Sequence, residues 1–178
     1  MRRRYCNFDQ RGLNCSNTFH LKTIQNNLDM KEFKLPDNLK FNRGMIQNPV
    51  HYFDETGCNS WLFLVGEEFA DMPGGMSYEQ VQEVTPNARN VISDPPRELN
   101  LELAKKHVEA LDELPGPTLI SCRSGPRASA VAYMYSGLKS GADPQDVISA
   151  AEKDDAPFVQ SEDYKKWVVD SMEALRGQ

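Results

Sequence analysis

The segment from Pro117 to Leu138, PTLISCRSGPRASAVAYMYSGL, is the feature that most constrains the fold of this chain. It begins with a short apolar run typical of a buried strand, passes through a loop with a cysteine, two arginines and a glycine, and continues as an alanine-rich helix. A strand that leads directly into a helix is the first half of a unit of parallel strands. The segment therefore predicts an α/β fold.

The chain alternates in the same way from about residue 60 onward. Strands are expected at Trp61–Val65 and Ala88–Ser93. Helices are expected to begin at the capping residues Ser77, Asn100 and Asp143, and a last helix is expected over residues 161–177. This alternation predicts three layers, with a central, mostly parallel sheet flanked by helices.

Charge and cysteine content narrow the classes of function. The net charge of -6 and the pI near 5.1 argue against nucleic acid or an anionic membrane as a partner. No apolar run is long enough to span a bilayer, so a soluble protein is expected. The four cysteines lack the close pairs that zinc sites use, so we expect no metal and no cofactor. A reducing, intracellular and cytoplasmic setting follows, which would leave the thiol of Cys122 free to react.

Residues 1–29 differ from the rest in charge, with five basic and two acidic side chains. One interpretation is a segment for organelle import, because it is basic and lacks the apolar centre of a secretory signal. The other is a disordered tail that precedes the domain. In both cases residues 30–178 are expected to form a single α/β domain.

The loop from Cys122 to Arg127 has the chemistry of an anion site. Backbone N–H groups at a helix N-terminus converge there, which favours a bound oxyanion and a more acidic, more nucleophilic Cys122. Gly125 can adopt the positive φ that such a tight loop needs. Arg127 can hold two oxygens of a phosphate or sulfate in its fork. Arg123 is expected to face solvent or contact substrate.

The loop CRSGPR resembles the active-site loop of rhodanese-like domains, with four residues between cysteine and arginine. It resembles more closely the phosphatase-like domain found fused to beta-lactamase-like hydrolases, a domain of unknown function (DUF442) with a CRSGxRS loop. That domain is related to dual-specificity and protein tyrosine phosphatases, so the resemblance implies a protein tyrosine phosphatase-like fold. It is good over residues 89–157 and loose over residues 40–88.

The resemblance also implies roles for individual residues. Cys122 would attack phosphorus, Arg127 would hold the phosphate oxygens, and an aspartic acid would protonate the leaving group. Asp94 is the first candidate for that acid, because a right-handed crossover would set Ala88–Ser93 beside the strand that precedes Cys122. Asp71 is the second candidate. Substrate binding is expected at Arg123, Ser124, Gly125 and Ala128.

Three departures from the family pattern bear on turnover. Pro126 removes one N–H donor from the loop. Ala128 stands where the family has Ser or Thr, and Ser129 is one position late on the helix. Ser121 replaces the histidine usual in the related phosphatases. These departures weaken the case for turnover more than the case for anion binding.

Three functions remain open on a phosphorylated or sulfur-containing substrate. The first is a cysteine-dependent phosphatase-like hydrolase that forms a phosphocysteine intermediate. The second is a rhodanese-like sulfurtransferase in which Cys122 carries a persulfide. The third is a module that binds phosphate or sulfate without turnover.

Overall fold

The computed structural model describes residues 32–94 and 98–176 of the chain. The expectations for residues 1–29 lie outside the described residues. The chain divides into two units, residues 1–31 and 32–178, and the account below concerns the second. None of the described helices is long and apolar enough to cross a membrane.

The centre of this unit is a parallel sheet. Its four strands, all parallel within the described residues, are β1 (Leu39–Phe41), β2 (Ser60–Val65), β3 (Ala88–Asp94) and β4 (Thr118–Ser121), and they lie in the order β1-β4-β2-β3. Every residue of β2 and β4 is buried, which explains their continuous apolar runs. The two strands are also joined by a hydrogen bond of 2.8 Å between the hydroxyls of Ser60 and Thr118.

The strand order corrects one expectation. We expected Ala88–Ser93 beside the strand that precedes Cys122, but β2 lies between β3 and β4. The crossover from β3 to β4 therefore passes over one strand. The physical reason is that all six residues of β2 are buried, which suits a strand inside a sheet that has other strands on both of its edges. The carboxyl ends of β3 and β4 nevertheless lie at the same edge of the sheet, because the strands are parallel.

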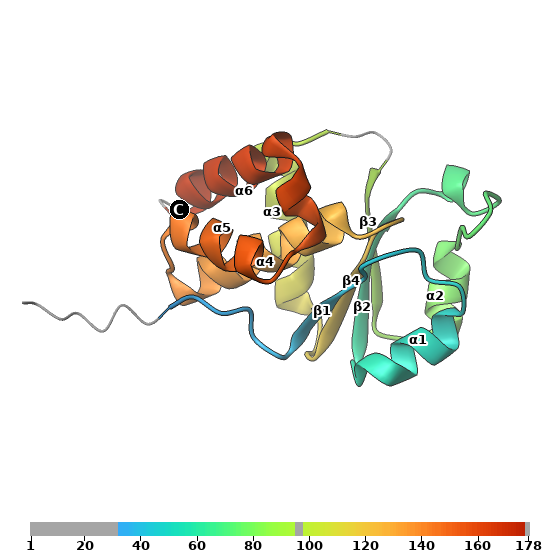
Figure 1. Ribbon diagram of the computed structural model, residues 1–178. Coiled ribbons are helices and arrows are strands. Elements are labelled where there is room, and N and C mark those ends of the chain that lie inside the picture. Colours follow the sequence, from blue (N-terminus) through green and yellow to red (C-terminus); the bar gives the residue numbers. More distant parts are fainter. Residues whose placement is uncertain (1–31, 95–97, 177–178) are drawn as a thin grey trace, which may run out of the picture. The chain divides into compact units, whose positions relative to one another are not determined.

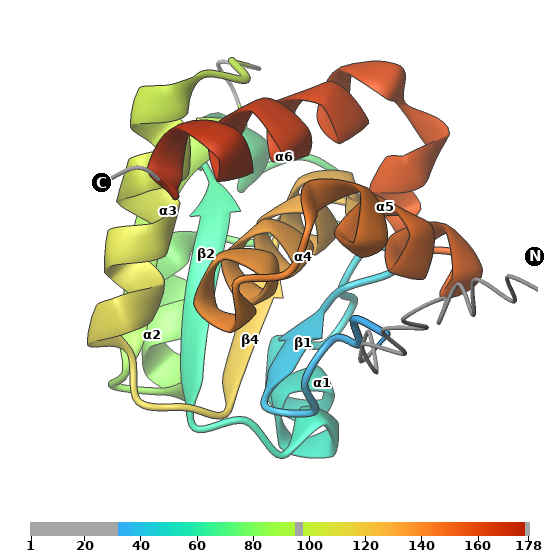
Figure 2. The same cartoon turned by 90° about the vertical axis from the view of Figure 1, so that its left-hand side faces the viewer.

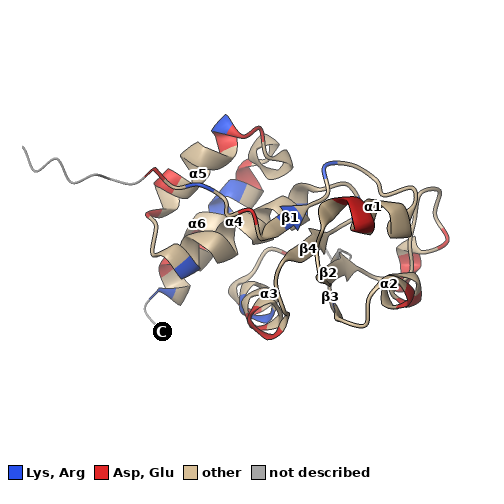
Figure 3. Cartoon of the chain, turned by 90° about the horizontal axis from the view of Figure 1, so that it is seen from below, with Lys and Arg blue, Asp and Glu red and all other residues tan. Residues whose placement is uncertain are grey.

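Helices cover both faces of the sheet (Figures 1 and 2). On one face lie α1 (Pro49–Thr56) and α2 (Tyr78–Val84). On the other lie α3 (Leu101–Glu113) and α4 (Pro126–Ser140), with α5 (Pro144–Lys153) and α6 (Glu162–Leu175) packed against α4. Two short 3₁₀ helices, η1 (Glu67–Phe69) and η2 (Pro157–Gln160), complete the described elements. Figure 3 shows the charged residues mainly on the helices and loops around the sheet.

The composition of α4 follows from its place between the sheet and the outer helices. Most of its residues from Arg127 to Gly137 are buried. A Cβ atom at Gly137 would lie 2.7 Å from Cγ2 of Val147 in α5, and it would also meet Met172 in α6. Small side chains are therefore needed for this close approach. The alanine-rich sequence after Cys122 is explained by packing on both sides.

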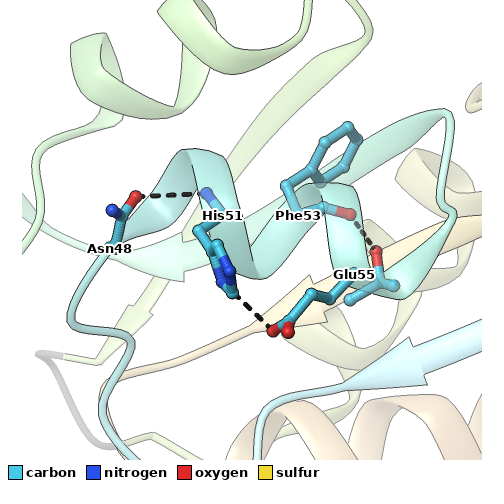
Figure 4. A network of polar contacts seen from close by, with 5 residues as sticks. Asn48, His51, Phe53 and Glu55 are labelled. Atoms are coloured by element: carbon cyan, nitrogen blue, oxygen red, sulfur yellow. Dashed lines mark hydrogen bonds and ion pairs between the residues drawn. The ribbon is translucent and has the colours of Figure 1, made fainter.

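Side-chain caps mark the starts of four of the described helices, α1, α2, α3 and α5. Ser77 and Gln80 form the expected capping box of α2, while Asn100 and Asp143 cap α3 and α5. The sequence analysis missed α1, which has a similar cap (Figure 4). There, Oδ1 of Asn48 accepts a hydrogen bond of 3.1 Å from the N–H of His51.

Candidate functional site

The loop that carries Cys122 connects the end of β4 to the start of α4 at Pro126. Gly125 ends this loop with a φ of +113°, as its sequence position predicts. A Cβ atom at this position would also meet the carbonyl oxygen of Asn42. Glycine is therefore required twice here, once by the backbone conformation and once by the close approach of another segment.

Backbone N–H groups surround the sulfur of Cys122. The N–H of Gly125 donates to Sγ at 3.2 Å, and the N–H groups of Ser124, Arg127 and Ala128 also act on the sulfur. Pro126, which has no N–H, is the gap in this series. The loop thus presents several donors toward one point, as an anion-binding turn does.

The acidity of Cys122 differs from the expectation. Only 6% of the residue is exposed, and this burial raises the pKa of the thiol above its ordinary value. The surrounding N–H groups lower the pKa, but by less than burial raises it. The expected increase in acidity is therefore wrong for the free protein, because sequence alone does not reveal how deeply the thiol is buried.

Arg127 is almost fully buried, with 1% of its surface exposed. Its Nη1 donates to the carbonyl oxygen of Glu98 at 2.9 Å. The guanidinium lies over the rings of Tyr164 and Trp167, at 5.7 and 5.8 Å from their centroids. Nε and Nη2 have no hydrogen-bond partner among the described residues. These two nitrogens form one side of the guanidinium, the side that binds two oxygens of an oxyanion at once.

Cys122 and Arg127 line the same cavity, which has a volume of about 300 Å³. Its other lining residues are Leu99, Ser124, Pro126, Ser161, Asp163 and Tyr164. Cys122 also borders a second, much smaller cavity, which is lined mainly by apolar side chains such as Phe63 and Met76. There the guanidinium of Arg123 lies 5.3 Å from the ring centroid of Phe69. Cys122 therefore borders two cavities that differ in the character of their lining side chains.

The two candidate acids are placed differently. Asp94 ends β3 in register with Val65 of β2, so its backbone lies at the same sheet edge as the Cys122 loop. The side chain of Asp94 lies outside the described part of the chain, and its role stays a prediction. Asp71 is exposed in a turn after η1 and borders neither cavity next to Cys122.

The two described residues that follow Arg127 in the helix offer the site no free hydroxyl. Ala128 is fully buried. Ser129 donates to the carbonyl oxygen of Pro126 at 3.0 Å and accepts from the N–H of Phe158 at 3.2 Å, so it connects α4 to η2. Ser129 therefore points away from the cavity, as expected. Before the loop, Ser121 accepts a hydrogen bond of 2.7 Å from the indole of Trp61.

Asn42 is a site residue that the sequence analysis missed. It follows β1 and is fully buried against the backbone of Cys122. A single asparagine after an unpredicted three-residue strand gives no signal that could have been read from the sequence.

His107 is a fully buried residue of α3 that interacts with Arg127. Its Nε2 is 3.3 Å from Oγ of Ser93, and its ring meets the ring of Trp167 edge-on. Burial, together with the positive charge of Arg127, lowers the pKa of His107 to about 3. The imidazole is therefore neutral at physiological pH.

Comparisons with known proteins identify the fold. No protein-family model matches the chain, and no curated protein matches it significantly. The crystal structure of nma1982 from Neisseria meningitidis Z2491, described as a candidate phosphatase, matches with a TM-score of 0.54 and 12% identity, over 80% of this chain and 99% of that one. The crystal structure of TpbA from P. aeruginosa is less similar, with a TM-score of 0.47 and 15% identity over 78% of this chain and 87% of that one.

The match to nma1982 confirms the expected three-layer α/β, protein tyrosine phosphatase-like fold. At 12% identity it concerns the fold alone. Membership of the DUF442 family and the link to rhodanese-like domains stay predictions.

Proposed function

We propose that this protein is a cysteine-dependent phosphatase-like hydrolase that cleaves a phosphate ester through a phosphocysteine intermediate. One observation carries the proposal: the buried guanidinium of Arg127 has two nitrogens without a hydrogen-bond partner among the described residues, and Arg127 borders the same cavity as Cys122. Buried donors without partners are costly, and an oxyanion would satisfy both of them. The N–H groups around the sulfur support the same assignment, because they would complete the coordination of the anion.

The raised pKa of Cys122 determines how the nucleophile would form. The thiol is protonated at neutral pH, so its proton would pass to an oxygen of the bound phosphate dianion. The sulfur then attacks phosphorus, and the bond between phosphorus and the leaving oxygen breaks. Asp94 is the candidate that gives this oxygen a proton. Water next attacks phosphorus and gives a proton to the carboxylate of Asp94, the bond between sulfur and phosphorus breaks, and phosphate leaves with Cys122 and Asp94 restored.

Phosphate binding without turnover is the second candidate function. It is favoured by the absence of a hydroxyl at Ala128 and by the commitment of the Ser129 hydroxyl to Pro126 and Phe158. In the second step, no hydroxyl at these positions would then help the thiolate of Cys122 to leave phosphorus. The rhodanese-like alternative is supported only by the length of the loop, which has four residues between Cys122 and Arg127.

A paired assay on the full chain tests these functions. Hydrolysis of an aryl phosphate and transfer of sulfur from thiosulfate to cyanide are measured for the wild type and for Cys122→Ser. Cys58→Ser is the matched control, because Cys58 is also a buried free cysteine but does not belong to the loop. Phosphate release that is lost only in Cys122→Ser would support the hydrolase. Sulfur transfer alone would refute it, and phosphate binding with neither activity would favour the binding module.

A further inference from the structure

We propose that Asn42 is a positioning residue that holds the Cys122 loop in the geometry needed to bind an anion. This inference rests on the proposed function, because it assumes that the loop binds phosphate. Asn42 belongs to the segment after β1, which is 80 residues before Cys122 in the sequence. β1 and β4 are neighbours in the sheet, so this distant residue reaches the start of the loop.

The side-chain amide of Asn42 binds both backbone groups of Cys122. Its Nδ2 donates to the carbonyl oxygen of Cys122 at 2.8 Å, and its Oδ1 accepts from the N–H of Cys122 at 3.1 Å. Nδ2 also donates to the carbonyl oxygen of Gly44 at 2.8 Å. The amide is fully buried, so water does not compete for these bonds. It fixes the peptide groups on both sides of Cys122.

This fixed orientation has a consequence for the rest of the loop. Because the N–H and the carbonyl oxygen of Cys122 are both directed at Asn42, neither is turned toward the sulfur. The following N–H groups, including those of Ser124 and Gly125, are left to face it. The backbone of Asn42 contributes as well, since its carbonyl oxygen occupies the place where a side chain at position 125 would stand.

The chemistry at position 42 specifies an amide. A side chain there must offer a donor and an acceptor at once, because Cys122 presents one group of each kind. An ionised aspartate has the same shape but only acceptors, and it would add a negative charge beside the anion site. A protonated aspartic acid would again offer a donor and an acceptor. The amide of asparagine, the ionised carboxylate and the protonated carboxylic acid therefore differ in hydrogen bonding much more than in size.

The test compares Asn42→Ala and Asn42→Asp with Asn90→Ala in the full chain. Nδ2 of Asn90 donates to the backbone carbonyl oxygens of Phe63 and Val65 in β2, each at 3.1 Å, so this control loses similar bonds to a strand rather than to the Cys122 loop. Alkylation of Cys122 by iodoacetamide is followed across a pH series by mass spectrometry of the peptide that contains it. Protection by inorganic phosphate against alkylation gives the affinity of the anion.

We expect Asn42→Ala to weaken phosphate protection about tenfold or more, because two hydrogen bonds that orient the loop are lost. Asn42→Asp is expected to weaken it further and to move the alkylation profile to higher pH. Phosphate protection of Asn42→Asp, compared with the wild type at the same pH, is expected to recover as the pH falls and the introduced carboxyl group is protonated. Asn90→Ala is expected to lower the melting temperature and to leave alkylation and protection unchanged.

A role limited to stability would give another pattern. Lower melting temperatures in both Asn42 variants, with the alkylation profile and phosphate protection of the wild type, would overturn the inference. The two variants differ in size, so the test remains decisive if one of them does not fold. Failure of the proposed function is recognised separately, as a wild type that phosphate does not protect. In that case, the shift of the alkylation profile in the Asn42 variants would be the measurement that tests whether Asn42 positions the loop.

Discussion

Replacement of Arg127 gives the sharpest test of the anion site. Arg127→Met removes the charge but keeps a flexible apolar side chain against the rings of Tyr164 and Trp167. Arg127→Lys keeps the charge but replaces the two-nitrogen fork by a single ammonium group. The pair of variants therefore separates the geometry of the fork from its charge.

Nε and Nη2 of Arg127, which have no partner in the part of the chain that the structure describes, set the expected magnitude. A hydrogen bond to a charged group contributes about 1.5–3 kcal/mol, so a fork that makes two of them contributes about 3–6 kcal/mol. Since about 1.4 kcal/mol corresponds to a factor of ten, Arg127→Met should lower kcat/KM for an aryl phosphate about 10²–10⁴-fold. Arg127→Lys retains one such bond and should lower it about 10–10²-fold.

The assay measures kcat/KM together with the melting temperature in the presence and absence of inorganic phosphate. Phosphate should raise the melting temperature of the wild type, because a ligand that binds only the folded state stabilises it. The increase should disappear in Arg127→Met. Wild-type kcat/KM in Arg127→Lys, or an unchanged effect of phosphate in Arg127→Met, would refute the assignment of the fork.

Two further predictions concern stability. Gly125→Ala should reduce the free energy of unfolding by about 1–3 kcal/mol or more in a denaturant titration, and it should abolish phosphate binding. The reason is that a φ of +113° strains an L-residue and that the added Cβ would meet the carbonyl oxygen of Asn42. Unchanged stability would contradict this account of the loop. The second concerns His107, whose pKa falls from 6.5 to about 3, so the unfolded chain takes up a proton before the folded one. The free energy of unfolding should therefore fall as pH decreases below 6.5, by up to about 5 kcal/mol near pH 3. His107→Gln should remove this part of the acid sensitivity, and an identical pH dependence in the variant would show that other groups cause it.

The sequence predicted those parts of the fold that depend on neighbouring residues. The capping box at Ser77 and Gln80 and the strand before Cys122 are determined by short segments, and the structure contains both. The positive φ of Gly125 follows from a tight loop between a strand and a helix, and it was predicted for the same reason. Local chemistry and local structure agree at these positions.

The features that were missed depend on distant parts of the chain. The place of β2 between β3 and β4 results from how the strands pair, which no single segment encodes. The burial that raises the pKa of Cys122 comes from elements that pack around the loop. Asn42 acts on Cys122 only because β1 and β4 are neighbours in the sheet. Strand order, solvent exposure and distant contacts therefore needed the three-dimensional structure.

The position of β4 in the sheet also bears on how the protein is synthesised. β4 lies between β1 and β2, although it follows both of them in the sequence. As the chain leaves the ribosome, β2 and β3 can pair early, but β1 must wait for its neighbour until residues 118–121 have emerged. Contacts between segments distant in sequence form late because closing long loops costs entropy. A nascent chain that ends before β4 would therefore lack both the nucleophile and the partner strand of β1, so the site cannot assemble until this late part of the chain has been synthesised.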